Sequence, residues 1–437
     1  MFATEDDLTP TRDGLVGSWR AREYHGRPLT DEVVFLRSVS KAVAAVAIAS
    51  SAALFIAACG SSSPSSSSSK LSSSQVPKLS YTDFNLSFSA MAKLKILATH
   101  GSGKVAAILP DTVSSTRYVE FDAPYLAKAM TDAGVPKSDQ IIQNAQGSDA
   151  TEYADAQADI TKGAKVLIMD PLDPGTGEKI EAYAKKQGVP VIDYDRITLG
   201  GSRKYYVSFN NVYVGTLLGQ GLVSCIKNWG VKSPKVIVMR GDPTDNNATL
   251  FADGYDAVMA PYFSNGSWKD VANPAGTWTP TTALSEFQAA YTKNPSANAV
   301  LMPNDENGAP IIHYLQTKGI KPDTFPVTGQ DATLTGIQNI ISGYQCGTVY
   351  KPIYLEAQAA VALAMYLRAG ITPPSSLVNG TVKDIDEHNF PVPSILETPE
   401  WVTAQTVQST IVKDGFVPAS QICAGTFAKD CTKYGIS

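Results

Sequence analysis

The sequence predicts an α/β protein of two successive lobes, each built on a parallel sheet with helices on both faces. From Lys104 onward, short runs rich in β-branched and apolar residues alternate with amphipathic stretches. Near-continuous apolar strands joined by helices are typical of parallel sheets buried on both faces. The 437 residues, 43% hydrophobic and 18% charged, suffice for two sizeable cores and exclude a wholly disordered chain.

Two series of strands follow one another along the chain. The first series is predicted at residues 104–110, 139–145, 165–171, 189–195 and 205–211, and the second at 235–241, near 271, at 299–305 and at 325–331. Between them, residues 119–133 carry apolar side chains at helical spacing and end at Gly134. The apolar stretch 353–369 includes Glu356 and Arg368, so we expect a buried packing helix there and not a membrane span.

The first 58 residues are interpreted as a targeting segment. Residues 42–58 form an uncharged, mostly apolar run that follows Arg37 and Lys41, as in a secretory signal. The run ends in Ile-Ala-Ala before Cys59, which resembles the lipobox of bacterial lipoproteins and implies cleavage before Cys59 and lipidation of its thiol. An uncleaved membrane anchor is the alternative, although the run is short for a span. Because residues 1–33 are long and polar, we expect the true start nearer Val34.

A tether is predicted next, over residues 59–90. Within it, residues 61–75 include eleven serines in fifteen positions and have little to bury. A lipid, a flexible tether and a folded body, in that order, indicate a module held at the outer face of the cell membrane.

Polar and aromatic residues gather where the predicted strands end. They are Arg117 and Tyr118, Asp195 and Arg196, Asn246 and Asn247, Asn304 and Asp305, Asp331, and Lys351. Ligands of open α/β sheets bind beyond the carboxyl ends of the strands. A single such pair is uninformative because helix caps also favour Asp and Asn, but their recurrence in both series predicts the two walls of one cleft.

Six segments in the same order resemble the sugar-binding lipoproteins of bacterial ABC importers, within the ribose and galactose group of periplasmic binding proteins and nearest to its D-xylose-binding members. The segments are LPDTVSSTRYVEFDAPYL, VIDYDR, GDPTDNNATLF, PNDENG, PVTGQD and TVYKPI. The resemblance covers roughly residues 103–400. It implies the type I fold, in which two Rossmann-like lobes joined by three hinge crossings close on one sugar.

The resemblance also implies how the chain is divided. Lobe 1 is expected from residues 91–208 plus 350–371, and lobe 2 with the C-terminal tail from 209–349 plus 372–437. The crossings are expected near 208–211, near 348–351 and after the helix that ends near Gly370.

A neutral sugar offers flat C–H faces and a ring of hydroxyls, so its site needs aromatic surfaces and planar charged groups. The aromatic candidates are Tyr118, which matches a family aromatic position, and Trp278, which a packed turn would also explain. Asp195 and Arg196 match the family's Asp–Arg pair, whose fork and carboxylate hold adjacent hydroxyls; a structural ion pair is the alternative.

The remaining candidates complete both walls. Asn246 and Asn247 open a helix, where capping is the alternative role, and Asn247 is favoured as the direct ligand. In the second lobe, Asn304 and Asp331 match the family's polar pair. Near the hinge, Lys351 matches a family lysine, and from the first lobe Arg117 is expected to supply a further donor.

Five cysteines leave an even number once Cys59 is set aside. Three pairings of Cys225, Cys346, Cys423 and Cys431 are possible in an exported protein. We expect Cys423 to bond Cys431, which would clip a tail with little core of its own, and Cys225 to bond Cys346.

Other classes of function are disfavoured. The net charge of -5 gives no basic surface for nucleic acid. Residues 386–388 (Asp-Glu-His) lie in a loop without a partner motif for a metal, and the four histidines are scattered without a catalytic motif. No second, opposed acid is assigned for glycoside chemistry, so we expect neither an enzyme nor a cofactor.

The expected function is capture of a monosaccharide, D-xylose or a related aldopentose, by closure of the lobes and delivery to an ABC permease. The protein is expected to act as a lipid-anchored monomer. A sugar-sensing subunit that presents its ligand to a membrane receptor kinase is the alternative, because binding and closure would be identical.

Overall fold

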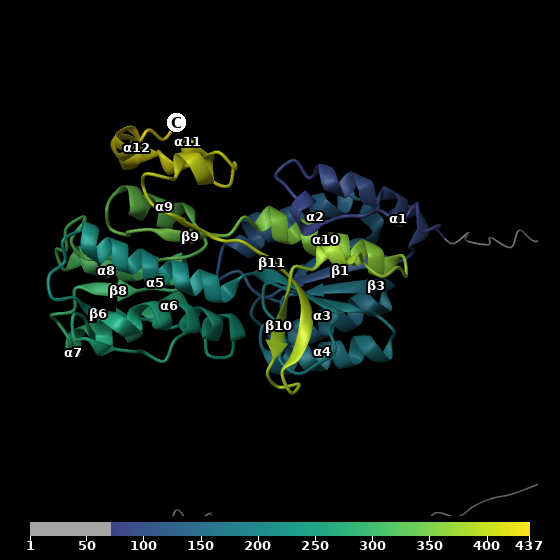
Figure 1. The fold of residues 1–437 in the computed structure, drawn as a ribbon, viewed down its shortest axis with the longest axis horizontal. Coiled ribbons are helices and arrows are strands. Elements are labelled where there is room, and N and C mark those ends of the chain that lie inside the picture. Colours follow the sequence, from purple (N-terminus) through teal and green to yellow (C-terminus); the bar gives the residue numbers. More distant parts are fainter. Residues whose placement is uncertain (1–70) are drawn as a thin grey trace, which may run out of the picture. The chain divides into compact units, whose positions relative to one another are not determined.

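A seven-stranded sheet organises the first lobe of the computed structural model, which describes residues 71–437 (Figure 1). The strand order is β10-β11-β5-β4-β3-β1-β2. Its strands are β1 (Lys104–Leu109), β2 (Gln140–Asn144), β3 (Ala164–Met169), β4 (Val191–Tyr194), β5 (Tyr205–Phe209), β10 (Gly380–Asp384) and β11 (Phe390–Glu397). All neighbours pair in parallel except β10 with β11. The predicted signal segment, Cys59 and the tether as far as residue 70 lie outside the described residues. The prediction that the tether extends to residue 90 is wrong, because Leu79, Phe84 and Phe88 are buried in the core of the first lobe.

Helices cover both faces of this sheet, as the apolar strands predict. In β1, Val105, Ala107 and Leu109 pack in a cluster with α2 (Ala123–Asp132) and α10 (Ile353–Arg368). The alternate residues Ala106 and Ile108 pack with α3 (Asp149–Thr161) and α4 (Pro174–Lys186) on the opposite face. A further helix, α1 (Lys95–His100), lies on the α2–α10 side. The period-2 alternation of side chains along a strand produces these two separate cores.

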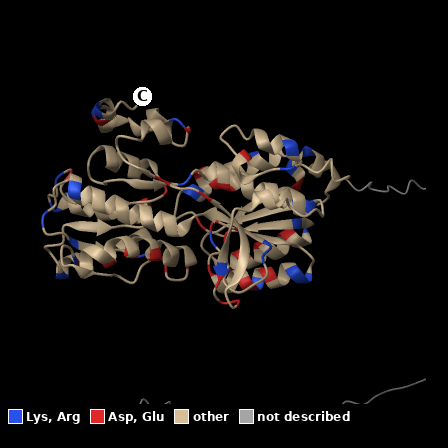
Figure 2. Cartoon of the chain, viewed as in Figure 1, with Lys and Arg blue, Asp and Glu red and all other residues tan. Residues whose placement is uncertain are grey.

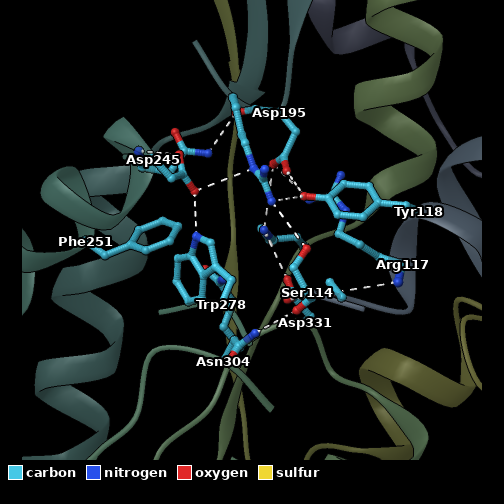
Figure 3. A pocket seen from close by; sticks show the side chains of 14 residues that line it. Ser114, Arg117, Tyr118, Asp195, Asp245, Phe251, Trp278, Asn304 and Asp331 are labelled. Carbon is cyan, nitrogen blue, oxygen red and sulfur yellow. Dashed lines mark hydrogen bonds and ion pairs between the residues drawn. The ribbon is translucent and has the colours of Figure 1, made fainter. Parts of the chain in front are cut away.

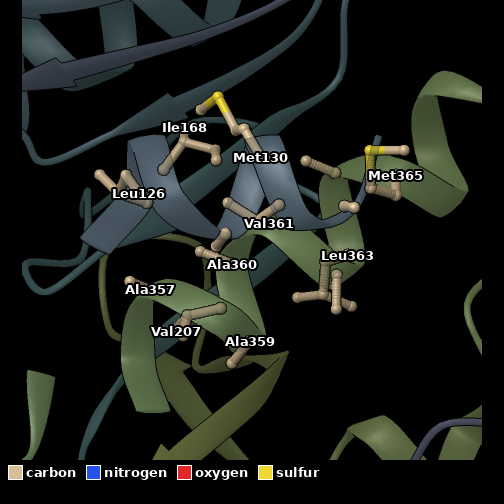
Figure 4. Packing of buried hydrophobic residues seen from close by; sticks show 14 of the residues in the cluster. Leu126, Met130, Ile168, Val207, Ala357, Ala359, Ala360, Val361, Leu363 and Met365 are labelled. Carbon is tan, nitrogen blue, oxygen red and sulfur yellow. The ribbon is translucent and has the colours of Figure 1, made fainter. Parts of the chain in front are cut away.

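Helix α10 is the packing helix that the sequence predicts. Every residue from Ala357 to Tyr366 is buried, with Val361 close to Leu126 and Met130 of α2 (Figure 4). Its many alanines let the helix approach both α2 and the sheet closely. Within residues 71–437, no helix is long and apolar enough to cross a membrane.

The second lobe has a smaller parallel sheet. Its strands are β6 (Lys235–Val238), β7 (Lys269–Ala272) and β8 (Ala299–Leu301), in the order β7-β6-β8. The strand predicted at 325–331 makes only isolated bridges, from Val327 to Val300 and from Gln330 to Val349. One reason is that Pro326 has no N–H to donate to a ladder. Beyond it, β9 (Thr348–Tyr350) pairs antiparallel with β12 (Glu400–Val402).

Five longer helices surround this sheet and its extension. They are α5 (Asn211–Asn228), α6 (Asn246–Ser264), α7 (Pro280–Lys293), α8 (Asp305–Thr317) and α9 (Leu334–Ile341). The closest helix pair is α5 with α6, where Gly215 and Gly254 leave no room for a side chain. A methyl group on Gly215 would collide with the main-chain oxygen of Phe251.

Short 3₁₀ and π turns complete the described chain. They lie at Tyr81–Asp83, Ser89–Leu94, Tyr118–Asp122, Lys137–Asp139, Ser375–Leu377, Gln408–Val412 and Gly425–Phe427. The π turn at Tyr118–Asp122 runs directly into α2, so the helix predicted at 119–133 begins irregularly.

The path between the lobes differs from the expectation at one place. The crossings at β5–α5 and at β9–α10 fall where they were expected. After α10, however, the chain adds β10 and β11 to the first sheet, and Ser394–Glu397 pair with Tyr206–Phe209. The third crossing therefore lies between β11 and β12, and residues 380–397 belong with lobe 1 and not with lobe 2. The pairing of segments almost two hundred residues apart carries no local signal in the sequence.

The C-terminal tail packs on the second lobe through a separate apolar cluster. Its helices are α11 (Ala419–Ile422) and α12 (Ala428–Tyr434), and Ile422 and Cys431 are buried in the cluster with α9. Disulfide bonds join Cys423 to Cys431 and Cys225 to Cys346 in the structure. The tail also reaches lobe 1, because the ring of Phe416 stacks on that of Phe121 with centroids 3.8 Å apart.

Candidate functional site

The strands of both lobes end around one polar pocket, which we call the inner pocket (Figure 3). Figure 2 shows acidic and basic residues side by side at this junction. The lining residues are Ser114, Ser115, Arg117, Tyr118, Asp195, Arg196, Asp245, Asn247, Phe251, Trp278, Asn304, Gln330, Asp331 and Lys351. The cavity between these side chains is about 30 Å³. Since about 10–15 Å³ holds one water molecule, a sugar ring requires the side chains to move apart.

Nine of the ten predicted ligand residues line the inner pocket. The exception is Asn246, which lies at the first turn of α6 and lines a separate surface hollow with Thr249 and Pro243. Asn247, which was favoured as the direct ligand, lines the inner pocket, whereas Asn246 does not. Their roles as ligands remain predictions.

Five lining residues were not predicted. They are Ser114, Ser115, Asp245, Phe251 and Gln330. For Asp245 a signal existed, because it directly precedes Asn246 and caps α6 by accepting the N–H of Asn247 at 2.9 Å. Ser114 and Ser115 lie in the same loop as Arg117, but the ring of Phe251 is brought to the pocket only by packing of α6.

Arg117 is the centre of a buried ion cluster beneath the pocket. Its Nε and Nη2 donate to the two carboxylate oxygens of Asp122 at 2.9 and 2.8 Å. Its Nη1 donates to Asp195 Oδ1 at 2.9 Å and its Nη2 to Glu356 Oε2 at 2.6 Å. Burial alone would lower the pKa of Arg117, but the three carboxylates outweigh it and raise the pKa well above its ordinary value. Four of its five N–H groups are thus engaged within the protein, and at most one remains for a ligand.

Asp195 is held in a strained and fully ionised state. Its φ of 56° lies in the left-handed region, which is unusual for a residue other than glycine. Three donors, Asn247 Nδ2, the Tyr206 hydroxyl and the Ser208 hydroxyl, fix its main-chain oxygen at 2.9, 2.7 and 2.8 Å. Burial raises the pKa of the Asp195 carboxyl, but Arg117, Lys351 and Arg196 together lower it to about 2.

A second point of backbone strain faces the first across the pocket. Asp331 and Ala332 have φ values of 88° and 49°. Strained residues that the surrounding structure holds in place tend to cluster at ligand sites. Asp195 and Asp331, whose backbones are strained, therefore line the same pocket from opposite lobes.

Arg196 differs from Arg117 because it is only loosely held. Its Nη2 donates to Ser114 Oγ and to the Tyr118 hydroxyl at 3.3 Å each. Its Nε lies 3.6 Å from Asp245 Oδ2 and 3.8 Å from Asp170 Oδ1, both beyond hydrogen-bond distance. The guanidinium is buried and charged, yet its donors lack short bonds, which suits it to bind hydroxyls.

Aromatic rings border the pocket from both lobes. Tyr118 is buried and its hydroxyl donates to Asp195 Oδ2 at 2.9 Å. From the other lobe, Trp278 donates its Nε1–H to Asp245 Oδ2 at 3.0 Å and meets Phe251 edge to face. Trp278 therefore packs in a fixed orientation and also lines the pocket, and its role as a ligand-binding residue stays a prediction.

Lys351 joins the lobes at the base of the pocket. Its Nζ lies 3.1 Å from Asp331 Oδ1 in lobe 2 and 3.9 Å from Asp195 Oδ1 in lobe 1. From lobe 1, Ser115 Oγ donates to Asp331 Oδ2 at 3.2 Å. These contacts require the lobes to be closed.

A second set of contacts closes one side of the cleft. Asn304 Nδ2 donates to the main-chain oxygen of Ser114 at 3.1 Å, and Glu306 Oε1 accepts the N–H of Thr116 at 2.8 Å. Burial, together with the charges of Asp331 and Asp305, raises the pKa of Glu306 to about 8. The carboxyl of Glu306 is in this environment only while lobe 1 covers it.

Among residues 71–437, no three His, Cys, Asp or Glu side chains are grouped to hold a metal ion. The predicted loop Asp386–His388 is exposed at the tip of the β10–β11 hairpin.

Two lobes of this topology, closed on a polar pocket at the strand ends, define a type I periplasmic binding protein fold. The chain belongs to the family described as periplasmic binding protein domain, whose model matches residues 106–372. The resemblance inferred from the sequence motifs is confirmed, and the members of this family are binding proteins and not enzymes.

Two relatives and one solved structure are similar to much of the chain. A D-xylose-binding periplasmic protein of Escherichia coli (strain K12) is 34% identical over 284 residues, which are 64% of this chain and 82% of the relative. A multiple sugar-binding periplasmic receptor of Rhizobium radiobacter is 30% identical over 337 residues, or 73% of this chain and 92% of the relative. A carbohydrate transporter solute-binding protein of Chloroflexus aurantiacus, solved with D-glucose, is similar with a TM-score of 0.64 and 27% identity, covering 72% of this chain and 97% of that one.

Proposed function

We propose that this protein captures a monosaccharide outside the cytoplasm, D-xylose or a related aldopentose, and delivers it to an ABC permease. The observation that carries the proposal is the pair of Arg196 and Asp331, which face the inner pocket from opposite lobes. A ligand held by both is bound fully only when the lobes close. The names of the relatives support the class of ligand, since two of them, at 34% and 32% identity, are D-xylose-binding periplasmic proteins.

The chemistry of the pocket suits a neutral polyol. The carboxyl oxygens of Asp195 and Asp331 accept hydrogen bonds from hydroxyls, and Arg196, Lys351 and Asn247 donate to hydroxyl oxygens. The rings of Tyr118 and Trp278 offer apolar faces to the C–H surfaces of a sugar.

The inner pocket has to widen before a sugar can enter, since its cavity is about 30 Å³. The contacts most easily exchanged for hydroxyls are the long ones, from Arg196 to Asp245 at 3.6 Å and from Lys351 to Asp195 at 3.9 Å. Short cross-lobe contacts at Glu306 and Asn304 then stabilise the closed form.

Titration calorimetry with D-xylose, L-arabinose, D-ribose and D-glucose tests the proposal. Replacing Arg196 by Ala should cost about 2–4 kcal/mol of binding, or about thirty- to a thousandfold in affinity, because buried hydroxyls lose a charged donor. A matched control is Arg368→Ala, a buried arginine that bonds main-chain oxygens of Gly103 and Ala98, away from the pocket. Unchanged xylose binding by the Arg196 variant would refute the site, and failure of the wild type to bind any monosaccharide would refute the ligand class.

The route of delivery requires a separate experiment. Loss of xylose uptake in cells that lack this protein supports transport, whereas unchanged uptake with lost xylose-dependent signalling supports the receptor-kinase alternative. We expect a monomer in both cases, which sedimentation tests.

Membrane attachment is proposed through Cys59. The support is the apolar run that ends in Ile-Ala-Ala-Cys and the serine-rich stretch after it. Cys59→Ser should release the protein from membranes, since two acyl chains are enough for stable anchoring. Intact mass that still includes residues 1–58 in wild-type cells would contradict the proposal.

A further inference from the structure

A second cavity, the outer pocket, continues the inner pocket toward the surface. The two share Ser114, Arg196, Asp245 and Trp278, of which Ser114, Asp245 and Trp278 are labelled in Figure 3. The outer pocket measures about 270 Å³, against about 30 Å³ for the inner one. The two pockets are therefore adjacent, separated by these four side chains, and the larger volume lies in the outer one.

The outer pocket stays open although the lobes are closed. Lobe 1 contributes Asp111, Val113 and Gly147 to its wall, and lobe 2 contributes Thr244 and Thr279. Within residues 71–437, no hydrogen bond joins these five residues across the gap, and the cross-lobe contact at this pocket is the long ion pair from Arg196 Nε to Asp245 Oδ2 at 3.6 Å. By contrast, hydrogen bonds of 2.8 to 3.2 Å close the side of the cleft at Asn304, Glu306 and Asp331. The gap at the outer pocket is therefore present while the opposite side of the cleft is closed.

Small side chains at the walls create this space. Ser114, Gly147, Thr244 and Thr279 stand where longer side chains would fill the gap. For comparison, an apolar cavity of about 150 Å³ accommodates benzene. A volume of about 270 Å³ is large enough for one further sugar ring.

The chemistry of the walls also matches a carbohydrate. Trp278 borders both pockets, so its ring extends an apolar surface from one to the other. Val113, which is 59% exposed, adds a further apolar patch. Around them, Gln146, Asp242 and Asp111 supply amide and carboxylate groups that hydrogen-bond hydroxyls. The mixture of one aromatic face and several polar groups is that of a sugar subsite.

We propose that the site takes a carbohydrate longer than one ring: the terminal unit enters the inner pocket, and a second, covalently linked sugar lies in the outer pocket. This inference rests on the proposed function, and it extends the substrate class from monosaccharides to short oligosaccharides. The link between the rings takes the place of the long contact from Arg196 to Asp245, while the cross-lobe hydrogen bonds at Asn304 and Glu306 are kept.

Titration calorimetry of the full chain with D-xylose and with xylobiose, its β-1,4-linked dimer, tests the proposal. We expect xylobiose to bind within about tenfold of D-xylose or more tightly, and mass spectrometry of the bound ligand should find the intact dimer. Thr279→Trp should obstruct the outer pocket and weaken xylobiose by at least about tenfold, with D-xylose changed less than about twofold. Thr279 suits this test because it is exposed, makes no side-chain cap bond to α7 and does not line the inner pocket.

Thr279→Ser is the matched control and should leave both affinities unchanged. Val113→Trp obstructs the pocket from the opposite lobe and serves if the first variant does not fold. Xylobiose binding more than about tenfold weaker than D-xylose, or equal loss of both ligands in the tryptophan variants, overturns the proposal while the proposed function stands. A wild-type protein that binds neither sugar refutes both.

Discussion

Arg117 offers the sharpest test of how the first lobe is held together. It is 2% exposed and donates four hydrogen bonds to three carboxylates. These are Asp122 in the π turn before α2, Asp195 after β4 and Glu356 in α10. The variant Arg117→Met keeps a long side chain but removes the positive charge, so Asp122, Asp195 and Glu356 lose their common cation. Removing one partner of a buried ion network costs about 3–5 kcal/mol, and we expect that loss in the free energy of unfolding at pH 8.

The pH dependence separates electrostatics from packing. In the wild type, the pKa of Asp195 is lowered to about 2, so its contribution to stability is present above its ordinary pKa and is lost only as pH falls toward 2. Burial raises the pKa of Asp122 and Glu356 even beside Arg117, and without Arg117 less opposes this effect of burial at all three carboxyls. A group with a raised pKa in the folded state is stabilised as pH falls, because protonation removes the buried charge. The deficit of the Met variant should therefore shrink between pH 8 and pH 5.

Urea unfolding followed by circular dichroism at both pH values measures this difference. Arg117→Lys keeps a charge but not the planar fork, and should lose about 1–3 kcal/mol. Arg368→Met is the control, since Arg368 bonds mainly main-chain oxygens and its loss should depend little on pH. A loss below about 1 kcal/mol at pH 8 for Arg117→Met, or one that is the same at pH 5, would refute the reasoning.

Three further predictions concern closure, helix packing and the tail. In the closed structure the pKa of Glu306 is raised to about 8, so closure of the cleft takes up a proton. Sugar affinity should therefore weaken between pH 6 and pH 8, by at most about tenfold per pH unit. Glu306→Gln should flatten this dependence of affinity on pH. A flat calorimetric profile in the wild type contradicts this. Gly215→Ala should lower the free energy of unfolding by about 1–3 kcal/mol, because the added methyl group meets the main chain of α6. The control Gly308→Ala in α8, where there is room for a methyl group, should not lower it. Equal effects of the two variants on thermal unfolding would contradict the packing argument. Cys423→Ser should speed tryptic cleavage at Lys429 and Lys433 without affecting β1–β5, since the tail depends on that bond; an unchanged rate speaks against it.

Much of the architecture can be predicted from local patterns in the sequence. The alternation of strands and helices follows from apolar runs such as 165–171 and from amphipathic stretches such as 119–133. The position of the site follows as well, since polar residues directly after parallel strands share one edge of a sheet. For this reason the sequence could predict that Asp195, Arg196 and Asn304 share one pocket, and the structure brings the three together.

The order of residues along the chain indicates which side chains stand at the strand ends, whereas the contacts that each of them makes depend on how the chain folds. Two neighbouring arginine candidates look alike in the sequence, yet Arg117 is fully engaged by three carboxylates while Arg196 keeps its donors loosely held. The pairing of β11 with β5, the arrival of Phe251 in the pocket and the open space beside Trp278 likewise depend on segments far apart in the chain. Such long-range contacts arise from packing between whole elements, and no local pattern of residues encodes them.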